Sequence, residues 1–160
     1  MQFTQSMSYP GTVDEVVTMY LTPTYLERRF GQFVVEGSST VSVEGQRVSF
    51  AGTVRPELIP AAAARFVKSD LRIAFTEEWT TDEAEATSRT SVTVDGAPVS
   101  VEATSTLTGT ETGCTREVTG NVSVRVPLLG GRIEKEAVAH LGRVVEREQA
   151  LATQWLEEQR

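Results

Sequence analysis

Two acidic residues occupy positions where the surrounding pattern calls for apolar side chains. The segment 71–79 alternates in the manner of a strand, and Glu77 falls on its apolar face. Near the C-terminus, Glu148 projects into the apolar stripe of a predicted long helix, between Leu141 and Leu151. Because burying an unpaired carboxylate is costly, each residue must find a partner, take up a proton or line a wet cavity.

Arg116 is the candidate partner of these carboxylates. It shares a strand face with Val118 and Val122, and it could pair with either Glu77 or Glu148. In one interpretation the three charged residues form a polar patch inside an apolar pocket and orient the hydroxyl, carbonyl or carboxylate of a ligand. In the other, one or more of them lies at the rim of the sheet or in a structural salt bridge.

The remaining reactive side chains form no recognisable catalytic or metal-binding motif. His140 is the only histidine and lies at the edge of the helical stripe, as a boundary residue or, if it faces a pocket, as a lone acid or base. Cys114 is the only cysteine, which excludes an intramolecular disulfide, and we expect a small buried thiol. We therefore assign no catalytic residue, no metal ligand and no cofactor.

Composition sets further limits. The 160 residues suit a single domain over 1–160, and 39% hydrophobic with 23% charged residues is ordinary for a soluble protein. The net charge of −7 disfavours nucleic acid as a partner. The sequence has neither a long apolar run nor a signal-like N-terminus, so we expect a cytoplasmic protein without integral membrane association. Protein partners stay open.

The hydrophobic periodicity predicts the elements that must position these side chains. Thr12 and Glu15 form a capping-box pattern for a short helix, and Asp95-Gly96 is a strong hairpin signal. The segment 59–67 interrupts the strands, either as a lid over a pocket or as a simple crossover. We expect strands at 2–8, 33–43 (kinked at Gly37), 47–55, 71–79, 84–94, 99–108 and 114–126, and helices at 12–20, 25–30, 60–66 and 130–159.

This order predicts an α+β fold. Strands joined by tight turns pair antiparallel, and their alternation gives one apolar face. The C-terminal helix spans on the order of 40 Å and supplies a matching apolar stripe. We expect a curved antiparallel sheet of about seven strands, two short helices after the first strand, and the long helix packed across the sheet.

Four short segments carry a resemblance to a known family. They are FTQ at 3–5, YLERRF at 25–30, FTEEW at 75–79 and PLLGGRIE at 127–134. The element order resembles the START-like (SRPBCC, helix-grip) superfamily, and the chain is similar, over nearly its whole length, to the actinobacterial domain-of-unknown-function family 2505. The resemblance implies an internal pocket, because superfamily members bind lipids, hormones, polyketides and other apolar ligands between sheet and helix. Its motifs are architectural, and some members act as cyclases or hydrolases.

The leading functional hypothesis is binding of a small hydrophobic or amphipathic molecule, lipid-, polyketide- or isoprenoid-like, between the sheet and the C-terminal helix. One alternative is an aromatase/cyclase- or hydrolase-like enzyme that uses Glu77, Glu148 or His140 as acid or base. Another is a protein-interaction module with a filled core. The candidate ligand contacts are Phe50, Phe75, Glu77, Trp79, Val101, Arg116, Val118, Val122, Leu141, Val145 and Glu148.

Overall fold

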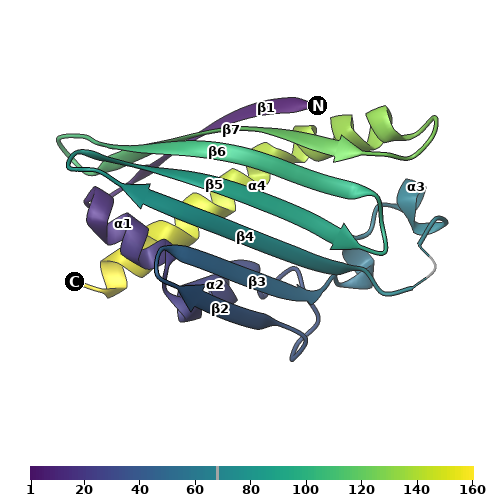
Figure 1. The fold of residues 1–160 in the computed structure, drawn as a ribbon, viewed down its shortest axis with the longest axis horizontal. Coiled ribbons are helices and arrows are strands. Elements are labelled where there is room, and N and C mark those ends of the chain that lie inside the picture. Colours follow the sequence, from purple (N-terminus) through teal and green to yellow (C-terminus); the bar gives the residue numbers. More distant parts are fainter. Residues whose placement is uncertain (68) are drawn as a thin grey trace.

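The computed structural model describes residues 1–67 and 69–160, which form one antiparallel sheet and four α-helices (Figure 1). The α+β architecture expected from the sequence is confirmed. In chain order the elements are β1 (Gln2–Tyr9), α1 (Val13–Tyr20), α2 (Pro23–Phe30), β2 (Thr40–Glu44), β3 (Arg47–Thr53), a 3₁₀ turn (Pro56–Leu58), α3 (Ala61–Ala64), β4 (Arg72–Thr81), β5 (Glu85–Asp95), β6 (Val99–Gly109), β7 (Cys114–Val124) and α4 (Gly130–Glu158).

The sheet has seven strands in the order β1-β7-β6-β5-β4-β3-β2 within the described residues. Strands β2 to β7 form a meander, and β1 adds to its far edge by pairing with β7. The predicted hairpin at Asp95-Gly96 joins β5 to β6, and Gly96 adopts φ +95°, a conformation that favours glycine. The register places Glu77, Thr90, Ala103 and Gly120 in one row across β4 to β7.

The long helix α4 lies across one face of the sheet, over β1 and β7 (Figure 1). Its 29 residues span about 43 Å at 1.5 Å per residue, so it crosses the whole sheet. The helices α1 and α2 gather near its C-terminal end, whereas α3 lies at the opposite end, with the turn between β7 and α4 (Figure 1). The two ends of α4 therefore face different surroundings.

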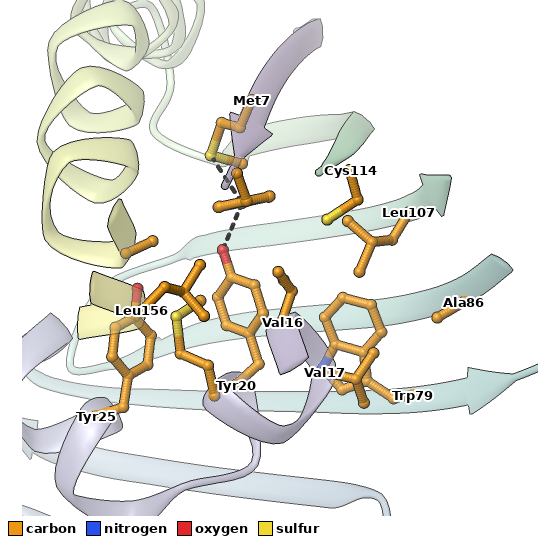
Figure 2. Close-up of a cluster of buried hydrophobic side chains, with 13 residues drawn as sticks. Met7, Val16, Val17, Tyr20, Tyr25, Trp79, Ala86, Leu107, Cys114 and Leu156 are labelled. Atoms are coloured by element: carbon orange, nitrogen blue, oxygen red, sulfur yellow. Dashed lines mark hydrogen bonds between the residues drawn. The ribbon is translucent and has the colours of Figure 1, made fainter. Parts of the chain in front are cut away.

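Two clusters of buried side chains form the core. The larger cluster joins α1, α2 and the C-terminal part of α4 to the sheet, and Figure 2 shows Val16, Val17 and Tyr20 facing Trp79 and Leu107. Within it, the Tyr20 ring stacks on Trp79 with centroids 5.5 Å apart. The smaller cluster packs α2 against β3 and β4, and consists of Leu26, Val34, Val48, Phe50 and Phe75.

The expected strand start at 33–36 is wrong. This segment makes one isolated bridge, between Val34 and Val54, and β2 begins only at Thr40. Two features account for this. Gly37, at φ +79°, turns the chain. The side chain of Val34 fills the space above Gly52, so that a Cβ atom added at position 52 would lie only 2.8 Å from a Val34 methyl carbon. The second helix also begins earlier than predicted, because Pro23 occupies its first turn.

Candidate functional site

A buried ion pair lies at the centre of the larger core cluster. Glu77 on β4 is 1% exposed and Arg116 on β7 is 3% exposed. Nη2 of Arg116 donates to Oε2 of Glu77 at 2.7 Å, and Nε of Arg116 donates to Ser105 Oγ at 2.9 Å. Thr90 Oγ1 also donates to Oε2 of Glu77 at 2.8 Å. Both oxygens of the Glu77 carboxylate are thereby paired, since Trp79 Nε1 donates to Oε1 at 3.1 Å.

A second ion pair joins α2 to α4 next to the first. Nη2 of Arg29 lies 2.6 Å from Oε1 of Glu148, with side chains 12% and 14% exposed. Nη1 of Arg29 lies 4.0 Å from Oε1 of Glu77, so the two pairs form one cluster of four charges. Because it contains two guanidinium groups and two carboxylates, the cluster of Arg29, Glu77, Arg116 and Glu148 has no net charge.

Aromatic rings surround this charge cluster. The guanidinium carbons of Arg29 and Arg116 lie 4.9 and 4.7 Å from the centre of the Tyr20 ring. The hydroxyl groups of Tyr9 and Tyr20 are 2.6 Å apart, and Tyr20 donates to Glu148 Oε1 at 3.2 Å. Cation–π contacts of this kind strengthen when the groups are desolvated, so the rings help to offset the cost of burying the arginines.

The electrostatic environment favours the ionised forms of Glu77 and Arg116. Burial alone would raise the pKa of the Glu77 carboxyl, but Arg116, Arg29 and hydrogen bonds from Arg116 and Thr90 hold this pKa below its ordinary value. Burial disfavours the charged form of Arg116, but Glu77 and the nearby tyrosines raise its pKa above the usual range.

Two polar atoms beside the charge cluster have no hydrogen-bond partner among the described residues. They are Oη of Tyr25 and Nη1 of Arg29, both buried and both without a hydrogen bond. Tyr25 and Arg29 are four residues apart on α2, so they lie on the same helix face. An unsatisfied buried donor costs about 1–3 kcal/mol, so we expect a further group to form hydrogen bonds with these two atoms.

An apolar cavity of about 250 Å³ lies at the other end of α4. Its walls come from β7, the N-terminal half of α4, the turn between β5 and β6, and the crossover between β3 and β4. No lining residue is charged or carries a polar side chain. The lining residues are Val54, Leu58, Ile59, Pro60, Ala63, Phe66, Val67, Leu71, Val94, Gly96, Ala97, Pro98, Val99, Val122, Val124, Val126, Ile133 and Ala137.

The structure divides the sequence-predicted contacts among five places. Glu77, Arg116 and Glu148 meet in the charge cluster, and Val122 lines the cavity. Their contact with a ligand stays a prediction. The others are distributed as follows: Trp79 lies in the larger core cluster, Phe50 and Phe75 in the smaller one, and Val101, Val118, Leu141 and Val145 are half-buried between sheet and α4.

The sequence analysis missed Arg29 and most of the cavity lining. The spacing of Tyr25 and Arg29, four residues apart beside buried Leu26, is the signal that places Arg29 on the inner face of α2. The segment 59–67, expected as a lid or a crossover, contributes Ile59, Pro60, Ala63, Phe66 and Val67 to the cavity wall.

The remaining candidate residues, His140 and Cys114, belong neither to the charge cluster nor to the lining of the cavity. His140 is exposed on α4. Cys114 is buried, and burial raises the pKa of its thiol to about 11. Over residues 1–67 and 69–160, no three His, Cys, Asp or Glu side chains come together in a way that would hold a metal ion. In the same residues, no helix is both long and apolar enough to cross a membrane.

This fold, an antiparallel sheet with a long C-terminal helix packed across it, is the helix-grip fold expected from the sequence. It is similar to the di-domain ARO/CYC protein StfQ from the steffimycin biosynthetic pathway, with a TM-score of 0.61 and 12% identity, over 99% of this chain and 51% of that one. It is also similar to norcoclaurine synthase from Thalictrum flavum, solved in complex with dopamine and hydroxybenzaldehyde, with a TM-score of 0.56 and 12% identity, over 98% and 87% of the two chains.

The family follows from the sequence. Residues 4–156 match the family described as Protein of unknown function (DUF2505), and the chain belongs to this family. An uncharacterised protein of Mycobacterium tuberculosis (strain H37Rv) is 27% identical over 168 residues, covering 96% of this chain and 95% of that protein. The resemblance drawn from the four short motifs is confirmed.

Proposed function

We propose that this protein binds a small hydrophobic or amphipathic molecule, lipid-, polyketide- or isoprenoid-like, in the cavity between the sheet and α4. The observation that carries the proposal is the cavity itself. Its volume is about 250 Å³, and its lining consists only of apolar side chains, glycine and proline. A space of this composition offers water few hydrogen-bond partners, whereas it offers a hydrocarbon close contacts with apolar walls.

The size of the cavity sets the size of the buried group. An engineered apolar cavity of about 150 Å³ in another protein binds benzene. The cavity here is larger, at about 250 Å³, and therefore suits a hydrocarbon group of about ten carbons, such as a fused pair of rings or the end of an acyl chain. Burying such a group contributes roughly 25 cal/mol for each Å² of apolar surface removed from water.

The crossover between β3 and β4 is the part of the wall best suited to admit a ligand. In its described residues, 54–67 and 69–71, the helical elements are a 3₁₀ turn of three residues and the four-residue helix α3. Leu58 and Phe66 line the cavity but are 47% and 48% exposed. Short elements with few buried contacts open at low cost in free energy. We therefore infer that this crossover acts as the lid of the cavity.

The comparisons support the same kind of function. Norcoclaurine synthase was solved with two small molecules bound, and StfQ acts in a biosynthetic pathway. Both share the fold of this chain at 12% identity. The fold supports a small-molecule site, and the lining of the cavity supports a hydrophobic ligand.

Native mass spectrometry of the protein purified from its own host tests this function. We expect a discrete additional mass that disappears when the protein is denatured, and the extract identifies its chemistry. A mass equal to that of the bare chain, together with no rise in melting temperature when an apolar probe such as naphthalene is added, would contradict the proposal.

A further inference from the structure

We propose that the ligand is an elongated, uncharged amphiphile whose hydrocarbon end fills the cavity and whose oxygen atom accepts hydrogen bonds from Tyr25 and Arg29. This inference rests on the proposed function and deepens it, because it adds a polar end to an apolar site. It assigns the two unpaired atoms of α2 to ligand binding and separates them from the paired charges beside them.

The polar end of the site is the α2 face that carries Tyr25 and Arg29. Tyr25 Oη and Arg29 Nη1 are the two buried side-chain polar atoms without a hydrogen bond among the described residues. The other terminal nitrogen of the Arg29 guanidinium group, Nη2, lies 2.6 Å from Glu148, which fixes the direction of the group. A guanidinium group only donates, so the missing partner is an acceptor.

The inner face of the sheet between the two ends carries apolar, half-buried side chains. Val92 on β5, Val101 on β6 and Val118 on β7 lie on the inner face of the sheet, yet all three are only half-buried. Leu141 on α4 is half-buried as well, and neither it nor Val101 belongs to either core cluster. An apolar strip of this kind, in the middle of the covered face, is suited to contact a hydrocarbon chain.

The dimensions indicate an elongated molecule. Ala137 lines the cavity and Glu148 contacts Arg29, and these two residues of α4 are 11 positions apart. At 1.5 Å per residue they are separated by about 16 Å along the helix. A compact ligand that fills the cavity does not reach Arg29, whereas an extended chain of about twelve carbons does.

The charges indicate an uncharged polar end. Arg29, Glu77, Arg116 and Glu148 already balance, with two positive and two negative groups in contact. An added carboxylate would leave one buried negative charge without compensation, which is costly in a poorly solvated site. A ketone, ester or alcohol oxygen accepts the hydrogen bonds without this cost.

The test compares three probes on the intact protein and on Tyr25→Phe. Naphthalene is small enough to occupy the cavity alone, 2-dodecanone reaches both ends, and dodecanoate replaces the ketone with a charge. Tyr9→Phe is the matched control, because the Tyr9 hydroxyl bonds to Tyr20 and lies outside the proposed contact. Dissociation constants come from calorimetric titration or from displacement of a fluorescent probe.

We expect Tyr25→Phe to weaken 2-dodecanone binding about three- to tenfold, the loss of one hydrogen bond, and to leave naphthalene binding unchanged. Stability should not fall, because the removed hydroxyl has no partner in the unliganded protein. We expect dodecanoate to bind the intact protein more weakly than the ketone. Two results would overturn the inference and leave the proposed function standing, provided that naphthalene binds. One is an equal affinity of the intact protein and Tyr25→Phe for 2-dodecanone. The other is tighter binding of dodecanoate than of 2-dodecanone to the intact protein. Failure of naphthalene to bind would count against the proposed function instead.

Discussion

Glu77 and Arg116 contact each other across two intervening strands: they lie on β4 and β7, and their side chains meet at 2.7 Å above β5 and β6. In a flat sheet, strands three positions apart are separated by roughly 14 Å. The curvature of the sheet and the length of the two side chains close this distance, and Ser88 and Ser105 below them bond to the guanidinium group. The pair therefore ties the curved sheet together from the inside.

Substitution of Glu77 by glutamine should lower the free energy of unfolding by about 3–5 kcal/mol, because it leaves the Arg116 guanidinium buried without a counter-charge. Urea denaturation monitored by fluorescence measures this difference. Glu78→Gln is the matched control, since Glu78 is the next residue of β4 and is exposed on the opposite face. Its change should stay within about 0.5 kcal/mol. Equal stabilities of the two variants would contradict a structural role for the pair.

Stability should also fall in acid, and Glu77 should account for part of that fall. The folded protein holds the pKa of Glu77 below the ordinary value of 4.5, so the unfolded chain binds a proton more readily. The stabilising effect is complete above about pH 4.5 and is lost as the pH falls through the lower, folded pKa. Denaturation curves collected across this range should show a smaller pH dependence for Glu77→Gln than for the natural chain. Parallel pH profiles would contradict this assignment.

The three tyrosines of the chain should resist ionisation while the protein stays folded. Tyr9, Tyr20 and Tyr25 are all buried, and burial raises the pKa of each above 10, in the case of Tyr9 to about 12. A pH titration followed by the ultraviolet absorbance of tyrosinate should therefore show no step near pH 10. Tyrosinate should appear only at higher pH, together with loss of tertiary structure. A reversible step near pH 10 in the folded protein would show that at least one ring is accessible.

The sequence analysis predicted the fold well, because the periodicity signals were strong and local. Alternation in β4 to β7, the Asp95-Gly96 turn and the stripe of α4 each lie within one segment. It placed Glu77, Arg116 and Glu148 on inner faces for the same reason. It did not show which of them pair, since this depends on the curvature that brings β4 and β7 together.

The cavity was beyond the reach of pattern reasoning. Its wall combines the crossover 54–71 with residues of β7 and α4, segments that are distant in the chain. An alternating strand looks the same whether its apolar face is packed, as at Phe75, or borders an empty space, as at Val122. Only the packing of the complete chain distinguishes these two outcomes.

The most direct test of the central claim is a naphthalene titration of the natural chain and of Ala137→Phe. Ala137 lies on the cavity wall, so a phenyl ring at this position fills the space, whereas Ala139→Phe places the same ring on the exposed side of α4 and serves as the control. We predict one naphthalene bound per chain in the natural protein and in Ala139→Phe, and none in a folded Ala137→Phe protein. Equal binding to all three proteins, or no binding to any of them, would contradict a ligand site between the sheet and α4.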